Sequence, residues 1–580
     1  MKRKHRHHFS YKKKFILGFL VFVLSLGLGY SVFGTNLEII GSLVLNQYKE
    51  PIIQPIGIDD SSDVFGSSID RGYIKTISIS NTINPPENIV ESIDIGVAQN
   101  GNVMAYLVQN QDDNEYYDLY IQGKDHLYAN EDSSYLFAYY YYLESLNGIE
   151  YLDTSRVHNM SNMFTFTGTY SSALTLNLGE NFDTSNVENM NEMFYGSGMS
   201  NQNFMLDLGD SFDTSNVITM ERMFDSTGYN SSAFTLDLGD KFDTSNVTTM
   251  SGMFSSTGHN SSVFTINLGD KFNTSQVESM NSMFYGLGYN NSQFTLDLGD
   301  QFDTSNVIDM QYMFYMLGHN CTNLELDLGD KFDTSQVTNM SKMFSNMGNK
   351  STKIILDLGD HFDTSQVTDM NNMFSSLGYD STELTLDLGD QFDTSNVTDM
   401  GSMFAYIGRK VQTLVLDLGN QFDTSNVTNM EYMFSRTGYY SQSFILNLGD
   451  RFDTSQVTNM GSMFYETANQ CPDVTINMGD HFNTQNVTNM NNMFNGLGFA
   501  DNDLVMDLSG FDFSSVTNYS RMFGVRKQYS YTNTPWKATQ KMYVKDSDAV
   551  DWIVTHVGSE SSDPDNSNIA VSRSNVLVKP

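Results

Sequence analysis

A nine-residue segment recurs at an unvarying interval of thirty residues through most of this chain. It reads FDTSNVTDM at 392–400, FDTSNVTNM at 422–430 and FDTSQVTNM at 452–460. Twelve copies, counted on the Asp of FDTS, follow one another without an insertion from Asp153 to Asn483. A thirteenth, divergent copy lies at 511–523. A period of this size predicts a solenoid, in which each copy forms one coil that stacks on the last.

Each copy predicts a short helix, a loop, a strand and a turn, as in residues 181–210. Four apolar side chains have the spacing of one helix face: Val187, Met190, Met193 and Phe194. Ser185 would cap the start of this helix and Gly198 would end it. The segment 204–208 alternates, so its Phe and both Leu should face the core while Met205 and Asp207 face outward.

One copy cannot fold alone. Its roughly seven large apolar side chains contribute about 10–20 kcal/mol when buried, whereas ordering thirty residues costs on the order of 30 kcal/mol or more. Stacking must supply the remainder, so equivalent side chains should lie over one another and each Phe should land on the next Phe. A register slip of one residue would turn the apolar face of the strand outward.

Methionine and cysteine also follow the period. Two Met in each of twelve copies make up 24 of the 34 methionines, and their shared face with Val and Phe predicts core packing rather than a soft binding surface. Cys321 and Cys471 occupy the same position of the copy five coils apart. At the spacing of paired strands they lie about 24 Å apart, too far for a disulfide, so both should be free.

The copies, with FDTSNVTNM followed by Met-Phe and LTLDLGD, resemble the BspA-type leucine-rich-repeat surface proteins and the related bacterial surface repeat family. The resemblance covers about 151–523, and the flanking segments are similar to those that surround such arrays. It implies an α/β solenoid: a leucine-rich-repeat-like right-handed coil with a parallel β-sheet on one face, short helices on the other and a β-rich N-terminal cap. It also implies extracellular location, adhesion and no catalysis.

The resulting division of the chain has six parts: a cytoplasmic basic leader at 1–14, a transmembrane anchor or signal peptide at 15–34, a linker at 35–72, a β-rich N-terminal cap at 73–150, the thirteen-copy solenoid at 151–523 and a C-terminal cap and tail at 524–580.

The N-terminal segment predicts the location. Seven Lys and Arg precede Phe15, and residues 15–34 carry no charged side chain over a length that can span a bilayer. The basic flank should stay in the cytoplasm, which places the rest of the chain outside the cell as a single-pass cell-surface protein. The alternative is a signal peptide that is cleaved after Ser31 or Gly34, which would make the protein secreted.

The charge is strongly asymmetric. The net charge is -38, and all 69 acidic residues follow Asn36 while seven of the 31 basic residues precede Phe15, so the part after the leader carries 24 minus 69, or -45. Such a surface repels phosphate backbones, which argues against a nucleic-acid partner. It favours solubility and cationic partners.

Acidic residues form three columns along the array: the Asp of FDTS, the last residue of LGD and the middle of the strand. The first two are interpreted as acceptors for turn N–H groups, because Asn273 and Asn483 replace Asp in the FDTS column. Calcium between coils is the alternative. The strand column faces outward and is the candidate binding face: Asp207, Asp237, Asp297, Asp327, Asp357, Asp387 and Asp417.

The chain shows no catalytic, cofactor-binding or metal-binding motif, so an enzyme is not expected. His259 and His319 share a position that elsewhere holds Tyr and read as loop aromatics. The loop after the glycine varies between copies, as at 199–203, 319–323, 349–353, 409–413 and 439–443. The sequence therefore predicts adhesion to a host or neighbouring-cell surface protein or glycan through the sheet face and these loops. A structural spacer or coat protein without a specific ligand, and a calcium-stabilised solenoid, are the alternatives.

Overall fold

The computed structural model describes most of the chain: residues 50–57, 62–299, 301–329, 331–359, 361–389, 392–419, 421–524, 526–527, 530–533, 536–558 and 571–580. The predicted leader at 1–14 and the predicted anchor at 15–34 lie outside these residues. None of the helices in the described ranges has the length and hydropathy of a membrane span.

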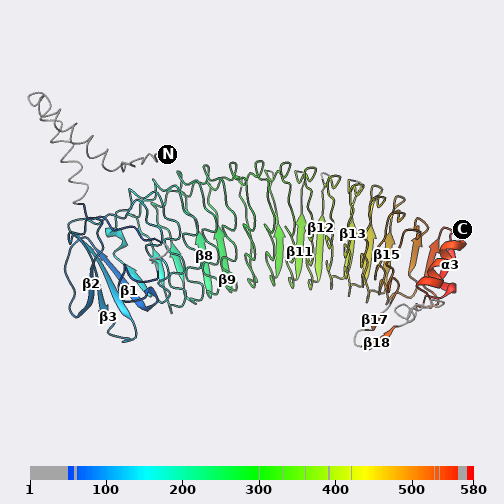
Figure 1. Ribbon diagram of the computed structural model, residues 1–580, viewed down its shortest axis with the longest axis horizontal. Coiled ribbons are helices and arrows are strands. Elements are labelled where there is room, and N and C mark those ends of the chain that lie inside the picture. Colours follow the sequence, from blue (N-terminus) through cyan, green and yellow to red (C-terminus); the bar gives the residue numbers. More distant parts are fainter. Residues whose placement is uncertain are drawn as a thin grey trace, which may run out of the picture.

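A five-stranded sheet precedes the array, in the order β2-β3-β4-β1-β5. Its strands are β1 (Ile74–Ser80), β2 (Ile89–Asp94), β3 (Val103–Gln109), β4 (Tyr117–Gly123) and β5 (Ser145–Asn147). The strands β2, β3 and β4 pair antiparallel, and β1 pairs parallel with β4 and β5. Two short 3-10 helices flank this sheet, η2 (Arg71–Tyr73) and η3 (Ile149–Tyr151). Figure 1 shows the sheet at one end of the long array.

The coils of the array stack in parallel, as the period predicts. Their strands pair exactly one copy apart, for example Leu356 with Leu386 and Asp357 with Asp387. The strands are β6 (Thr175–Asn177), β7 (Met205–Asp207), β8 (Ala233–Asp237), β9 (Val263–Asn267), β10 (Asn323–Leu326), β11 (Lys353–Asp357), β12 (Glu383–Asp387), β13 (Thr413–Asp417), β14 (Ser443–Asn447), β15 (Val474–Asn477) and β16 (Val505–Leu508). We call the side of the coils that carries these strands the strand side (Figure 1).

The predicted helices on the opposite side are wrong. Residues such as 191–200 form consecutive turns, and α3 near the C-terminus is the one α-helix among the described residues. In this run, which we call the turn side, backbone N–H groups alternate between two partners. The N–H of Met193 donates to the carbonyl of Met190 in its own coil (3.2 Å), whereas the N–H of Phe194 donates to Met223 of the next coil (2.9 Å).

Backbone conformation explains why no helix forms there. The residue directly before the second Met of each copy has a positive φ, as at Glu192 (55°), Lys342 (59°) and Tyr432 (60°). A right-handed helix cannot pass through a left-handed residue, and the carbonyls that it would use are bonded to the neighbouring coil. The spacing of the apolar residues comes from successive turns whose apolar side chains all point into the core. The prediction of a shared buried face was therefore correct, although the predicted helix was not.

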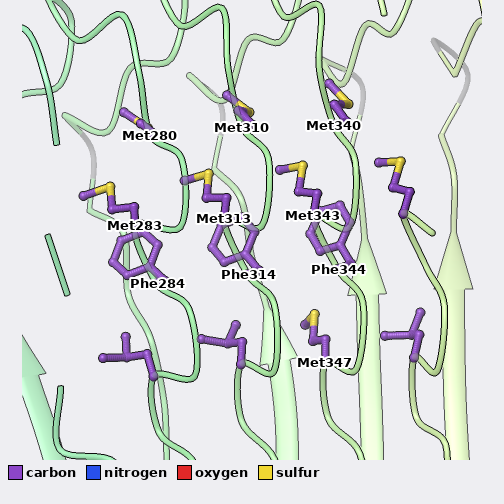
Figure 2. Packing of buried hydrophobic residues seen from close by; sticks show 14 of the residues in the cluster. Met280, Met283, Phe284, Met310, Met313, Phe314, Met340, Met343, Phe344 and Met347 are labelled. Carbon is purple, nitrogen blue, oxygen red and sulfur yellow. The ribbon is translucent and has the colours of Figure 1, made fainter. Parts of the chain in front are cut away.

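The core consists of files of identical side chains. The rings of Phe194 and Phe224 lie 5.4 Å apart with an interplanar angle of 4°, and those of Phe224 and Phe254 lie 5.8 Å apart at 3°. Both Met of each copy are fully buried, which confirms their interpretation as core. Figure 2 shows Met283, Met313 and Met343 side by side from successive coils, with the Phe file beneath them. This is the stacking that the fixed period requires.

Gly198 shows how the turn side meets the strand side. Its φ is 61°, and an added Cβ would lie 2.1 Å from the ring of Phe204, so no larger residue fits. The one departure in this column is Ala468, at a φ of 48°. The residue that its side chain faces by this register is Val474, where the other coils carry Phe, Leu or Ile. In this coil the extra methyl group of Ala468 is therefore matched by a smaller side chain, Val474, on the other side of the same contact.

The last coil continues into a small C-terminal unit. The strand β16 pairs parallel with β19 (Lys541–Val544), which pairs with β20 (Val576–Val578). The remaining described elements are α3 (Ser547–His556), η4 (Arg573–Asn575) and the pair β17 (Arg526–Lys527) and β18 (Ser530–Asn533). Trp552 of α3 stacks on Phe513 of the last coil at 4.6 Å. The predicted domain boundaries stay a prediction.

Candidate functional site

The strand side presents three outward positions in each five-residue strand. In β13, Leu414 and Leu416 are buried while Thr413, Val415 and Asp417 are exposed, and Met205 of β7 is 61 % exposed. All seven Asp of the candidate binding face are exposed in the same way. The predicted orientation of this column is therefore correct, and its side chains lie in register where neighbouring strands pair, as at Asp357 and Asp387.

Each of these Asp also holds the turn that follows the strand. Asp207 Oδ1 accepts the N–H of Gly209 (3.0 Å), and Asp357 Oδ1 accepts that of Gly359 (2.9 Å). The same bond forms at Asn267, which stands in this column in place of Asp. One carboxylate oxygen is thus engaged in the turn while the side chain stays exposed. Asn can replace Asp structurally here, but only Asp adds charge to the face.

Two depressions lie along the column of Asp side chains. One, of about 580 Å³, is lined by Asp327, Asp357 and Asp387 together with Glu325 and His361. A second, of about 500 Å³, lies between Asp297 and Asp327 and includes Lys331.

Asp207, Asp237 and Asp417 lie in the same column but line neither depression. The sequence reasoning missed Glu325 and His361. A signal was available for Glu325, which stands where neighbouring copies carry Thr295 and Ile355, but not for His361, whose position varies from copy to copy.

The last Asp of the column shows what this face accepts. Asp507 Oδ2 lies 2.7 Å from the ammonium of Lys579, which follows β20. Burial alone would raise the pKa of Asp507, but the bonds from Lys579 and Ser509 lower it overall. A primary ammonium therefore fits against the Asp column at the end of the array.

The FDTS column is a set of turn acceptors, as predicted. Asp183 Oδ1 accepts the N–H of Ser185 (2.9 Å), so Ser185 is the bonded residue rather than the predicted cap. Asn273 and Asn483 accept the equivalent N–H groups. Among the described residues, no group of three or more His, Cys, Asp or Glu side chains is placed to hold a metal ion. Calcium binding stays a prediction, which a rise in the Tm of the chelated protein on adding calcium would support.

The variable loops expose only some of their residues. The third position is buried in each coil, as at Asn201, Ser351 and Val411, whereas the two positions after it are exposed in most coils. In two coils this third residue is a cysteine. Cys321 and Cys471 are free, as predicted, and buried. Burial raises the pKa of the Cys321 thiol to about 12 and also raises that of Cys471, so neither is a reactive thiolate at neutral pH.

The first loop position forms an aromatic stack. The rings of Tyr229, His259, Tyr289 and His319 follow one another at centroid distances of 4.2, 4.1 and 4.1 Å. Nδ1 of each His is buried without a hydrogen-bond partner. Burial, reinforced by His319 for His259 and by Lys350 for His319, lowers the pKa of both imidazoles to about 4. These histidines are neutral packing groups of the loop edge.

Comparison with curated proteins and with solved structures finds no match to the chain. One protein family, described as Mycoplasma protein of unknown function, DUF285, matches repeatedly along the array. The matched segments are 132–263, 203–325, 229–354, 315–444, 346–474 and 442–549. Together they run without a gap from 132 to 549, which is most of the chain and includes every coil. With its stacked thirty-residue coils and buried Phe file, this repeat protein belongs to the DUF285 family.

Proposed function

We propose that this chain is an extracellular, cell-surface protein that adheres to a protein or glycan of a host or neighbouring cell, without catalysis. The contact surface is the strand side together with the exposed positions of the variable loops. The observation that carries the proposal is the Asp column, which is exposed along the array and in register where neighbouring strands pair. Weak contacts repeated along such a face add up to strong binding when they engage together.

Three further observations support this reading. The framework of each coil is repeated closely while the exposed loop positions differ, which is how a scaffold carries a recognition surface. The resemblance to the BspA-type surface proteins, noted from FDTSNVTNM and the flanking segments, implies adhesion. The uncharged segment 15–34 behind a basic leader fits a protein that is held at, or exported across, a membrane.

A structural spacer or coat protein is the second candidate. Its support is the core, because one continuous hydrophobic cluster runs from Ile53 to Val576. Such a core makes a stiff rod whatever its surface binds. Both functions use the same fold, so they differ only in whether the exposed side chains matter.

The test is to remove charge from the strand side without disturbing the fold. In one variant, Asp327, Asp357, Asp387 and Asp417 are replaced together by Asn. Asn keeps the turn bond to the following Gly, as Asn267 does, so the Tm should change little. Binding of cells carrying this variant to host-cell or matrix surfaces should be lost, as measured by counting adherent cells.

The matched control removes the same charge from the same coils on another side. Asp333, Asp363, Asp393 and Asp423 are replaced by Asn, which already occurs in this column at Asn273 and Asn483. This control should adhere normally. Equal adhesion of both variants and the unaltered protein would rule out the strand side as the contact surface and leave the spacer.

A further inference from the structure

A run of exposed tyrosine rings crosses from the N-terminal sheet to the first coil. Tyr73 and Tyr116 have ring centroids 6.3 Å apart, Tyr116 and Tyr142 lie 5.4 Å apart, and Tyr142 and Tyr170 lie 5.6 Å apart. We call these four residues the tyrosine patch. Tyr73 is 53 % exposed, Tyr142 37 % and Tyr170 57 %. Contiguous exposed aromatic surface of this kind marks an interaction site more often than isolated exposed residues do.

The patch already holds one ammonium. Lys75 Nζ lies 5.2 Å from the centroid of Tyr116, and it pairs with Asp113 (3.4 Å) and Glu144 (3.6 Å). Aromatic faces combined with carboxylates are the chemistry that recognises cations. The contact of Lys75 therefore shows which kind of group this surface accommodates.

The other rings of the patch have no such contact. Elsewhere on the protein, surface tyrosines are covered by cations of the chain itself, since Arg222 lies over Tyr195 (4.5 Å) and Arg409 lies over Tyr379 (4.8 Å). Within the described ranges, no Lys or Arg lies over Tyr73, Tyr142 or Tyr170. Tyr151 and Tyr432 are likewise exposed without a cation over the ring, but Tyr73, Tyr142 and Tyr170 have further tyrosine rings of the patch beside them.

Charge around the patch favours the same ligand. Asp113 and Glu115 lie near Tyr116, and Glu144 lies beside Lys75, so three carboxylates face the single ammonium of Lys75. Burial, with Tyr142, Asp113 and Glu115, raises the pKa of Tyr116, so its ring stays neutral. The chain beyond the leader carries a net charge of -45, as 24 minus 69. A cationic partner is therefore attracted at long range and held at short range.

We propose that the tyrosine patch binds lysine or arginine side chains of a basic segment on a partner protein. Tyr170 belongs to the variable loop of the first coil, but the patch shares no residue with the Asp column, so this proposal can hold or fail independently of the adhesion proposed for the strand side. The vacant ring faces take the cations, and the neighbouring carboxylates neutralise them.

The test measures binding of an oligolysine peptide to the full chain at physiological salt. In the double variant Tyr142→Ala/Tyr170→Ala the dissociation constant should rise about tenfold, because two exposed cation–π contacts of about 0.5–1 kcal/mol each are lost. This substitution leaves every charge unchanged, so attraction to the acidic columns is the same in both proteins. Any difference in affinity therefore reports on the rings.

Two controls and one reserve variant sharpen the result. Tyr142→Phe/Tyr170→Phe keeps both ring faces and should bind within about twofold of the unaltered protein. Tyr151→Ala removes a ring that is 45 % exposed but lies outside the patch, and it should have no effect. If the double variant loses its folded thermal transition, Tyr170→Ala alone carries the test, with an expected loss of about threefold.

Unchanged oligolysine affinity in a folded Ala variant would overturn the proposal. The proposal would also be overturned if the Ala variant lost binding to a neutral oligosaccharide instead of binding to the peptide. The rings would then stack on sugars and not on cations. The four-residue Asp→Asn variant of the strand side separates the two proposals. In this variant, Tyr142→Ala/Tyr170→Ala should still raise the dissociation constant for oligolysine about tenfold, even if cell adhesion is lost. Conversely, cell adhesion can persist if the tyrosine substitutions leave oligolysine binding unchanged.

Discussion

The turn side and the strand side of each coil are held together differently. On the turn side, a ladder of single β-bridges runs unbroken from Asp132 to Asn518, with one bridge between each pair of coils. On the strand side, the described strands fall into separate sheets: β6-β7, β8-β9, β10-β11-β12, β13-β14-β15 and β16-β19-β20. The coil at 293–298, between β9 and β10, forms no strand at all.

This difference shows which side is the framework. Alternate N–H groups of the turn side reach the next coil, and buried Thr hydroxyls add further bonds, such as Thr184 Oγ1 to the carbonyl of Asp213 (2.7 Å). The strand side can lose pairing in one coil because the turn side keeps the register. The side with the weaker backbone constraint is thus the one that carries the candidate binding face.

The largest expected effect compares two core phenylalanines. Phe314 of the turn side is stacked between Phe284 (5.6 Å) and Phe344 (5.5 Å), whereas Phe294 of the strand side has a ring neighbour on one side only, Phe264 at 6.2 Å. Phe314→Ala should lower the free energy of unfolding by about 4 kcal/mol and Phe294→Ala by about 3 kcal/mol. Urea unfolding measures both. A larger loss for Phe294→Ala would contradict the turn side as framework.

The next effect probes the contact between the two sides. Gly438→Ala should cost about 3 kcal/mol, because φ is positive and the new Cβ would lie 2.8 Å from the ring of Phe444. In a protein that already carries Phe444→Val, the same change should cost only about 1 kcal/mol, as the natural pair Ala468 and Val474 indicates. A thermal double-mutant cycle measures this coupling. Equal costs in the two backgrounds would mean that the two residues do not interact.

A buried hydroxyl of the framework gives the third comparison. Thr274 Oγ1 accepts the N–H of Asp303 (2.8 Å) and donates to its carbonyl (2.8 Å). Thr274→Val should lower the free energy of unfolding by about 2 kcal/mol, because the partly buried N–H and C=O of Asp303 lose their partner. Thr295→Val on the exposed strand side is the control, expected within about 0.5 kcal/mol. Similar losses at both positions would remove the distinction between the sides.

The smallest effect concerns the stacked histidines at the loop edge. Their pKa of about 4 in the fold lies below the ordinary 6.5. Above about pH 6.5 the imidazoles are therefore neutral in both the folded and the unfolded chain, and the folded state loses no stability to their protonation. As the pH falls toward 4, the unfolded chain binds protons first and stability declines, by about 1 kcal/mol per histidine after allowing for partial exposure.

The variant His259→Tyr/His319→Tyr isolates this contribution, because Tyr already fills the same position at Tyr229 and Tyr289. All carboxylates titrate alike in the two proteins. The difference in Tm between the variant and the unaltered protein should grow between pH 6.5 and 4. A difference that stays constant across this range would show that the imidazoles titrate normally in the fold.

The sequence alone determined the stacking, because one thirty-residue period with an unvarying apolar pattern admits only a continuous file of equivalent side chains. It therefore predicted the buried Met and Phe columns, the outward Asp207 to Asp417 face, the turn role of the FDTS Asp and the free cysteines. Side-chain alternation and spacing are local properties, so the amino-acid sequence is sufficient to predict them.

Only the tertiary structure decided how the backbone of the turn side runs. Met190, Met193 and Phe194 have helical spacing, but the carbonyls beside them are taken by the next coil, and Glu192 adopts a left-handed conformation. A hydrogen-bond partner thirty residues away leaves no local signal. The tyrosine patch was hidden for the same reason, since Tyr73, Tyr116, Tyr142 and Tyr170 meet only when the N-terminal sheet packs onto the first coil.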